Sequence, residues 1–256
     1  MRSIILIMVL ITATLTGCGV VKDTEVPSGA FPGEYYQVTD DKGNVLEFNK
    51  KPTRIYATTL SIEEILVDLV PLNRIVAISE PAADTKISLI ADKAAHISVK
   101  LPQKASTEKI LSLKPDLVIV QENSNAAFIQ SLKDVGLKVY ITKVPTTVKM
   151  VRSRIINLAA AVGEKQQGGK IINELDNKTE TVKKVIGQIP KSEKKNLMAY
   201  SLLGVFGSAE GLFHDICISA GVTNGAALAG LVRGEHLSKE KIVEVDPDIL
   251  MFSDYS

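Results

Sequence analysis

The feature that most constrains the fold is an alternation, beginning at Arg54, between short apolar runs and segments of helical period. The apolar runs include RIYATT, RIVAIS, DLVIV and LKVYIT, and SIEEILVDL and NAAFIQSLKDVG lie among them. Continuous apolar runs of this length are typical of strands buried on both faces of a parallel sheet, with helices as crossovers. The sequence therefore predicts an α/β fold with mainly parallel sheets, whose first lobe spans residues 35–146.

Residues with strong turn and capping preferences mark where several of these elements begin and end. Ser61 and Ser106 each stand at the start of a helical segment, where a serine side chain can cap free backbone amides. Gly136 follows the last turn of another predicted helix. Ahead of the alternation, two β-prone runs flank the turn-like residues 41–44, DKGN. We therefore expect an antiparallel hairpin to open the folded part of the chain.

Residues 147–189 contain no strand-like run and keep a helical period, with glycine interruptions at Gly163 and Gly168-Gly169. This predicts one or two long helices that join the first lobe to a second. The α/β alternation then resumes with NLMAYS, LFHDICISAG and DILMF. We assign residues 190–256 to this second lobe.

An internal repeat links the two lobes. STEKILSLKPDLVIV at 106–120 and SKEKIVEVDPDILMF at 238–252 share Ser, Glu, Lys, Ile, Pro and Asp at the same offsets. Each copy predicts a Ser-capped helix that turns into a buried strand, although shared turn chemistry alone could produce the match. A further helix and strand follow the first copy only, so we expect the C-terminal lobe to be truncated, with a sheet edge and an apolar face uncovered.

The first residues have the pattern of a secretion signal, predicted to cover residues 1–17. Arg2 precedes an apolar run that is shorter than the about 20 residues a membrane-spanning helix needs. Leu15-Thr16-Gly17-Cys18 resembles the bacterial lipobox, which implies that Cys18 is lipidated and anchors the protein to a membrane surface. Residues 18–34 then form a tether rich in Gly and Pro. The alternative is a soluble secreted protein cleaved at an ordinary site.

Charge argues against a nucleic-acid partner. The chain has 30 basic and 29 acidic residues, and Arg2 is the only charged residue before Cys18, so the mature chain balances at 29 of each. No basic excess remains to neutralise phosphates. If Cys18 carries lipid, Cys217 has no partner for an intrachain disulfide, and core packing must supply the stability.

Four segments together resemble one family. PTRIYATTLSIEEILVDL, ASTEKILSLKPDLVIV, the long helical linker and SAEGLFHDICISAGVTNGA are similar to the helical-backbone class of periplasmic binding proteins, which serve cobalamin, ferric siderophore and haem importers. The resemblance covers about residues 36–253. It implies two α/β lobes joined by a long rigid helix, a ligand held between the lobes, and modest closure only. It also implies a monomer without a cofactor, which delivers its ligand to the membrane permease subunits of an ABC importer.

The resemblance implies two docking glutamates, because members of the family carry one exposed glutamate on each lobe that meets arginines of the permease. Glu64, in SIEEIL, fits the first position, and Glu210, in GSAEGLF, fits the second. A carboxylate near a helix N-terminus is favoured by the helix dipole and can pair with an arginine fork. Glu63 competes for the first role, and both positions could instead hold ordinary acids of a first helical turn.

Ligand contacts are expected at the carboxyl ends of the strands, where open α/β sheets place their crevices. In the first lobe this selects Thr58, Thr59, Leu60, Glu80, Pro81, Glu122 and Asn123. In the second it selects the segment 203–206, which ends in Phe206. Arg233 and His236 lie where relatives place residues of the cleft. Arginine would suit a carboxylate or catecholate and histidine could ligate iron, although both could be solvated loop residues.

Other functions have weaker support. The sequence contains no dinucleotide, P-loop, nucleophile-elbow, H-E-x-x-H or C-x-x-C motif, and neither His96, His214 nor His236 has a recognisable catalytic partner. An enzyme is therefore not expected. A free metal-ion carrier and a surface lipoprotein without a transport role remain as alternatives. Tyr56 and Tyr200 lie within strands and are expected in the core. With no Trp, six Tyr and six Phe, the composition favours a ferric siderophore over haem or cobalamin.

Overall fold

A computed structural model describes residues 35–201, 204–232, 235 and 237–252 of the chain, all within one unit that spans Pro32–Ser256. The predicted signal peptide, Cys18 and the tether lie outside the described residues, as do Arg233 and His236.

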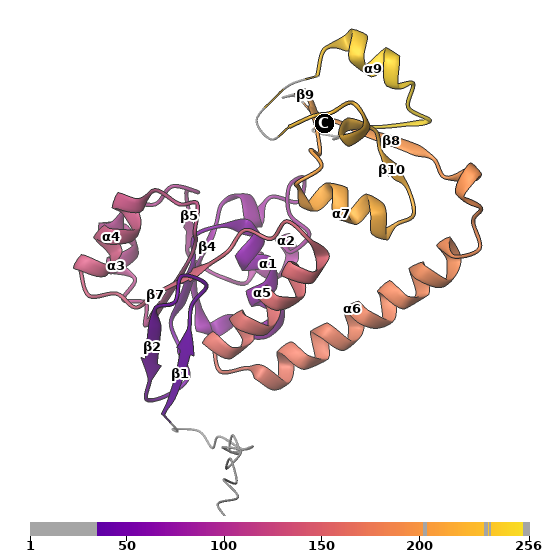
Figure 1. Ribbon diagram of the computed structural model, residues 1–256. Coiled ribbons are helices and arrows are strands. Elements are labelled where there is room, and N and C mark those ends of the chain that lie inside the picture. Colours follow the sequence, from indigo (N-terminus) through magenta and orange to yellow (C-terminus); the bar gives the residue numbers. More distant parts are fainter. Residues whose placement is uncertain (1–34, 202–203, 233–234, 236, 253–256) are drawn as a thin grey trace, which may run out of the picture. The chain divides into compact units, whose positions relative to one another are not determined.

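The predicted hairpin opens the described part of the chain. Strands β1 (Tyr36–Thr39) and β2 (Val45–Phe48) pair antiparallel (Figure 1). The Asp40 carboxylate closes the turn by accepting hydrogen bonds from the backbone amides of Lys42 and Asn44, at 2.9 and 2.8 Å. Gly43 supplies the positive φ, +87°, that this turn requires. The hairpin prediction is confirmed.

The first lobe contains a five-stranded parallel sheet of order β5-β4-β3-β6-β7. Its strands are β3 (Ile55–Ala57), β4 (Ile75–Ser79), β5 (Lys100–Leu101), β6 (Leu117–Gln121) and β7 (Val139–Thr142). The chain builds outward from β3 to β5 and then crosses back to β6. The strand order therefore reverses between β3 and β6, which is the topological switch point where open α/β sheets form a crevice.

Helices cover both faces of this sheet (Figure 1). They are α1 (Leu60–Leu69), α2 (Ala91–Ala95), α3 (Thr107–Ser112) and α4 (Ala126–Asp134), with short 3₁₀ turns at Leu72–Arg74 and Pro81–Ala83. Alternate residues of each strand face opposite layers. Ile55 and Ile119 pack with Leu66 of α1, whereas Tyr56 and Val118 belong to the core cluster on the α3 and α4 side. Each fully buried Ile or Leu contributes about 1.5–3 kcal/mol to folding.

Caps agree with the predictions at two of three sites. The Ser106 hydroxyl accepts from the backbone amide of Lys109, and Gly136 follows α4 with a φ of +81°. The prediction for Ser61 is wrong. The cap position of α1 is Thr59, two residues before Ser61, because Thr59 is extended and its carbonyl accepts from the amides of Ile62 and Glu63.

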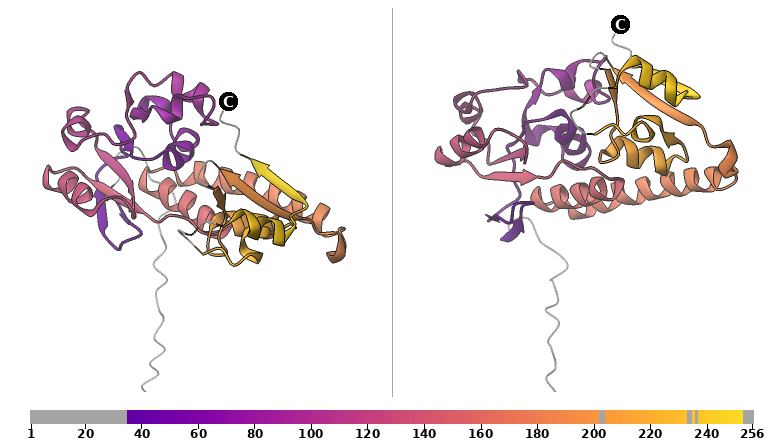
Figure 2. Two further views of the ribbon diagram at one scale, coloured as in Figure 1. Left: turned by 90° about the horizontal axis from the view of Figure 1, so that it is seen from above. Right: turned by 45° about the horizontal axis from the view of Figure 1, so that its top comes forward.

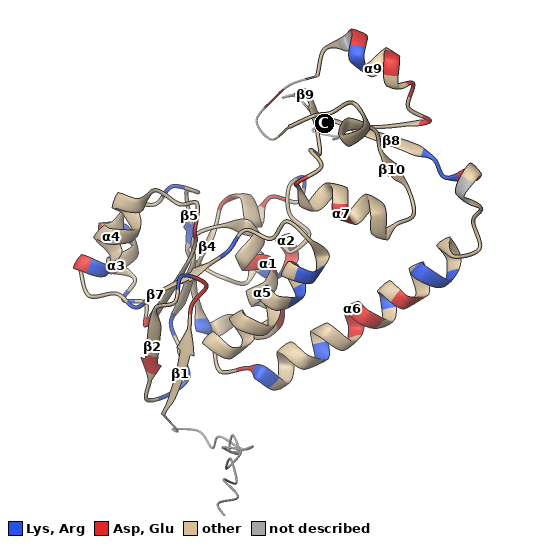
Figure 3. Ribbon diagram, in the orientation of Figure 1, with Lys and Arg blue, Asp and Glu red and all other residues tan. Residues whose placement is uncertain are grey.

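Two helices form the linker. Helix α5 (Val148–Ala161) is followed by the 22-residue α6 (Lys165–Ile186), which at 1.5 Å per residue is about 33 Å long (Figure 2). Gly163, with a φ of +76°, makes the turn between them. Basic and acidic residues are interspersed along α6 (Figure 3). None of the helices in the described part combines the length and apolar character needed to cross a membrane.

The second lobe is built around β8 (Asn196–Ser201). The strands β10 (Thr223–Asn224) and β11 (Ile249–Phe252) pair with it in parallel, and β9 (Gly204–Phe206) pairs antiparallel. The helices are α7 (Leu212–Ser219), α8 (Gly225–Leu228) and α9 (Lys239–Val245). The four side chains of β11 are between 40 and 64% exposed, whereas β6 lies in the core. That the lobe is truncated stays a prediction.

The internal repeat is confirmed in its capped helix and turn, but the prediction that each copy ends in a buried strand is wrong for β11, whose side chains are exposed. Ser106 and Ser238 cap their helices in the same way, and Lys114 and Asp246, eight residues further on in each copy, both adopt a left-handed backbone. Two residues later again, Asp116 accepts from the backbone amide of Arg54 and Asp248 accepts from that of Asn196. The two copies therefore support β3 and β8, the central strands of the two lobes, through the same contact.

Candidate functional site

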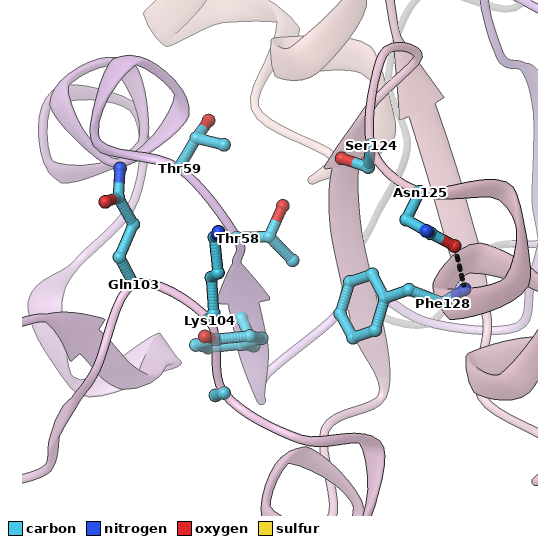
Figure 4. Close-up of a pocket in the computed structure, with 9 residues that line it drawn as sticks. Thr58, Thr59, Gln103, Lys104, Ser124, Asn125 and Phe128 are labelled. Atoms are coloured by element: carbon cyan, nitrogen blue, oxygen red, sulfur yellow. Dashed lines mark hydrogen bonds between the residues drawn. The ribbon is translucent and has the colours of Figure 1, made fainter.

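A pocket of about 490 Å³ opens at the switch point of the first lobe (Figure 4). Three segments line it: the end of β3 with the turn into α1, the loop after β5, and the turn from β6 into α4. The lining residues are Tyr56, Thr58, Thr59, Gln103, Lys104, Ala105, Ser124, Asn125 and Phe128. We call this the switch-point pocket. It brings together two of the sequence-predicted ligand residues, Thr58 and Thr59.

The backbone holds these two threonines but leaves their hydroxyls unpaired. The amide of Thr58 donates to the Ile119 carbonyl at 3.1 Å, which continues the pairing of β3 with β6. The carbonyl of Thr59 begins α1. Both Oγ1 atoms are covered by other atoms and have no hydrogen-bond partner within the described residues. A buried hydroxyl without a hydrogen-bond partner lowers the stability of the folded state by about 1–3 kcal/mol. A bound ligand that accepts a hydrogen bond from it would offset this cost.

The walls on either side differ in chemistry. Gln103 and Lys104 lie on one side and Phe128 on the other (Figure 4). Asn125 fixes the start of α4, since its Oδ1 accepts from the amides of Ala127 and Phe128 at 2.8 and 3.2 Å, and this positions the Phe128 ring. Among the lining residues that the structure describes, Lys104 is the only charged one and none carries a carboxylate. The pocket therefore suits a partly apolar ligand that carries anionic or hydrogen-bond-accepting oxygens.

Tyr56 forms part of the pocket wall from within β3. Its side chain is 2% exposed, as expected for the core, and burial raises the pKa of its phenol to about 12, with Glu63 a smaller contributor in the same direction. The phenol therefore stays neutral near pH 7 and offers a hydrogen bond, not a negative charge.

The other predicted ligand residues lie outside the pocket lining. Leu60 packs against the α1-side core, and Glu80 and Asn123 are exposed. Glu122 pairs with Lys42 of the hairpin at 3.1 Å. Phe206 packs edge-to-face on Phe213 in the second lobe, with ring centroids 5.3 Å apart.

The sequence did not point to Gln103, Lys104, Ser124 or Phe128. Strand β5 has only two residues, so no apolar run marks the end after which Gln103 and Lys104 follow. Ser124 lies one residue beyond the predicted pair Glu122 and Asn123, and that loop could have been extended to include it.

The two candidate docking glutamates of the first lobe have different surroundings. Glu63 is 1% exposed, and its carboxylate accepts from the Ser79 amide and the Ser79 hydroxyl, each at 2.6 Å. It is therefore not accessible to a partner protein. Glu64 is half-buried, and partial burial raises the pKa of its carboxyl. Within the described residues Glu64 has no hydrogen bond or ion pair, so its carboxylate is available.

Glu210, the candidate of the second lobe, is exposed and lies in the turn just before α7, whereas Glu64 is the fifth residue of α1, just past its first turn. In the described part of the chain Glu210 too has no hydrogen bond or ion pair.

The two histidines among the described residues, His96 and His214, lie in different lobes. His96 is exposed at the end of α2, and His214 on α7 is half-buried, with its Nδ1 3.3 Å from the side-chain nitrogen of Asn224. Among residues 35–201, 204–232, 235 and 237–252, no three His, Cys, Asp or Glu side chains lie close enough together to hold a metal ion.

The chain is similar to known binding proteins in sequence and in fold. Residues 55–255 match the family model described as periplasmic binding protein. An uncharacterized ABC transporter substrate-binding lipoprotein of Bacillus subtilis, YvrC, is 23% identical over 254 residues, which cover 96% of this chain and 79% of the relative.

Solved structures share the fold. The periplasmic haem-binding protein RhuT of Roseiflexus, in its apo form, aligns with a TM-score of 0.68 and 23% identity over 78% of this chain and 75% of its own. A possible iron-binding periplasmic solute-binding protein of Staphylococcus epidermidis aligns with a TM-score of 0.64 and 20% identity, over 81% and 79%.

Proposed function

Because the chain belongs to the periplasmic binding protein family, we propose that it is the solute-binding subunit of an ABC importer and carries an iron chelate to the membrane permease. Membership of this family makes it a binding protein and not an enzyme. The observation that carries the proposal is the switch-point pocket, in which the Thr58 and Thr59 hydroxyls have no partner among the described residues and Lys104 supplies a positive charge. The names of the Bacillus relative and of the solved structures support the transporter and the iron chemistry.

The lining of the pocket favours a ferric siderophore over haem or cobalamin. Haem iron is usually held by an axial His, Cys, Met or Tyr. In the described lining no His, Cys or Met is present, and Tyr56 is kept neutral by burial. A siderophore supplies all the iron ligands from its own oxygens and needs from the protein only hydrogen bonds, a cation and a ring to pack on. Arg233 and His236, outside the described residues, are proposed to complete the site from the second lobe.

Docking on the permease is proposed to use Glu64 and Glu210. Each is a carboxylate near the beginning of a helix and has no hydrogen bond or ion pair among the described residues, and a permease arginine can bind such a group through two parallel hydrogen bonds. Lipidation of Cys18 is proposed to hold the protein, as a monomer, at the outer face of the membrane.

A ligand screen tests the proposal. The chain without residues 1–17 is melted with ferric hydroxamate, catecholate and citrate chelates, haem, cobalamin, and free Zn²⁺ or Mn²⁺. A ligand at about 100 times its Kd adds about 2.7 kcal/mol of stability. Stabilisation by one ferric chelate supports the proposal, and stabilisation by a free ion favours the metal-ion carrier. A folded protein that none of these ligands stabilises would point to a lipoprotein without a transport role.

A further inference from the structure

A second, smaller pocket lies at the carboxyl end of β7, two strands away from β3. It has a volume of about 230 Å³ and lies between α5 and the segment that follows β7. Its polar lining residues are Asp41, Lys143, Ser153, Arg154 and Asn157. We call it the α5 pocket. It is separate from the switch-point pocket, since the two have no lining residue in common.

Arg154 is the unusual member of this set. It projects from the buried face of α5 and is only 4% exposed. Its Nη1 donates to the Ser61 hydroxyl at 3.4 Å, a long hydrogen bond. Its Nε and Nη2 are covered by other atoms and have no partner within the described residues. Burial lowers the pKa of the guanidinium, whereas the nearby Asp41 opposes that change.

The free nitrogens form one edge of the guanidinium. The N–H bonds of Nε and Nη2 point the same way and match the two oxygens of a carboxylate or the oxygen pair of a phosphate. Leaving such a charge buried and uncompensated costs several kcal/mol. A group that accepts both hydrogen bonds would remove most of that cost.

The carboxylate whose charge acts on Arg154 already accepts other hydrogen bonds. Asp41 accepts from the Asn157 side-chain amide at 3.1 Å through Oδ1, and from the Thr142 hydroxyl and the Lys143 amide, at 3.2 and 2.8 Å, through Oδ2. It forms no ion pair with Arg154 in the described structure, and acts on it only through its electrostatic field.

We propose that the α5 pocket binds a small oxyanion, a phosphate or a short carboxylate, which the side-on edge of Arg154 holds. The volume suits such an anion and is below the about 300 Å³ at which pockets for drug-sized ligands begin. Lys143 adds a second positive charge at the pocket. Because neither free nitrogen is in contact with solvent, entry requires a lining side chain to move, and the unbranched Met150 is the most adaptable.

The test uses inorganic phosphate, malonate and ferric citrate as probes, each at constant ionic strength, with the melting temperature of the full chain as the readout. Arg154→Met removes the fork and the charge, and Arg154→Lys keeps the charge without the fork, in case the first variant does not fold. Arg152→Met is the matched control, because Arg152 is on the same helix but pairs with Asp176.

We expect phosphate or malonate to raise the melting temperature of the wild type and of Arg152→Met, with a Kd at least about tenfold weaker for the Arg154 variants. A response to free anions assigns the site to them, whereas a response to ferric citrate alone, lost on Arg154 substitution, assigns it to a carboxylate of a chelate. If no probe acts, or if Arg152→Met and Arg154→Met respond alike, the proposal is wrong. A chelate that binds normally to Arg154→Met would leave the proposed transport function intact.

Discussion

Glu63, on the buried face of α1, accepts two hydrogen bonds from Ser79, one from its amide and one from its hydroxyl. Burial raises the pKa of this carboxyl more than the hydrogen bonds from Ser79 lower it. The folded state therefore holds a proton that the unfolded chain releases at its usual pKa of about 4.3. This contribution to stability is present below that pH and is lost as pH rises through the folded pKa.

Glu63→Gln should remove that dependence, because an amide does not ionise and can still accept from the Ser79 amide. The stability of the wild type relative to Glu63→Gln is expected to fall as pH rises from about 4 toward 7. Urea unfolding at several pH values measures this. Glu63→Ala, which leaves the buried Ser79 amide and hydroxyl proton without their acceptor, should cost about 1–3 kcal/mol near pH 4 and less as pH rises, because alanine does not ionise either. A pH-independent difference between wild type and Glu63→Gln would contradict the assignment.

Reversing the charge of Glu64 or Glu210 should abolish uptake of the ligand while its affinity changes less than about twofold. Each carboxylate is proposed to meet a permease arginine, and two like charges in contact cost several kcal/mol. Uptake is measured in cells or in vesicles that carry the importer, and affinity by calorimetry on the isolated protein.

The matched control for these reversals is Glu108→Arg, because Glu108, like Glu210, is an exposed acid near the beginning of a helix. It should leave uptake intact. Loss of ligand binding in Glu64→Arg, or equal loss of uptake in the control, would refute the docking role.

Thr58→Val should weaken binding of the chelate without lowering the stability of the protein. Valine has the shape of threonine but lacks the hydroxyl, which is buried and unpaired in the described structure. The free energy of unfolding should stay the same or rise by up to about 1 kcal/mol, while chelate affinity falls about fivefold to thirtyfold because one hydrogen bond to the ligand is lost.

Lys104→Glu should weaken an anionic chelate by more than about tenfold, and Lys109→Glu, on the exposed face of α3, is its control. Calorimetry on the wild type and the three variants measures the affinity for the chelate. If Thr58→Val and Lys104→Glu both bind the chelate as tightly as the wild type and the Lys109→Glu control do, the switch-point pocket is not the ligand site.

Local chemistry explains which parts of the fold could be predicted. The hairpin, the caps at Ser106 and Gly136 and the 106–120 and 238–252 repeat depend on turn residues and short-range periodicity. The same local reasoning placed Thr58 and Thr59 at the carboxyl end of a strand, where they line the switch-point pocket, because the apolar run before them is a clear strand.

The remainder of the pocket depends on tertiary contacts. Lys104 follows a strand of two residues, which leaves no periodic signal. Burial of Arg154 was equally hidden, because it depends on which part of α5 packs beside β7 and the hairpin. Ser61 shows the limit even of local chemistry, since Thr59 begins the helix through its carbonyl and without help from a side chain.

The two adjacent glycines of α6 offer a matched test of the linker packing. A Cβ added at Gly168 would lie 2.4 Å from the Cβ of Ala159 on α5, closer than two carbons can approach, whereas one added at Gly169 meets nothing within 4 Å. Gly169→Ala should stabilise the protein by about 0.5–1 kcal/mol through helix propensity alone. Gly168→Ala gains the same propensity but forces the helices apart, so it should destabilise by about 1–3 kcal/mol. Urea unfolding of both variants measures the difference. Equal stabilisation by both substitutions would show that α5 and α6 do not pack as closely as Gly168 permits.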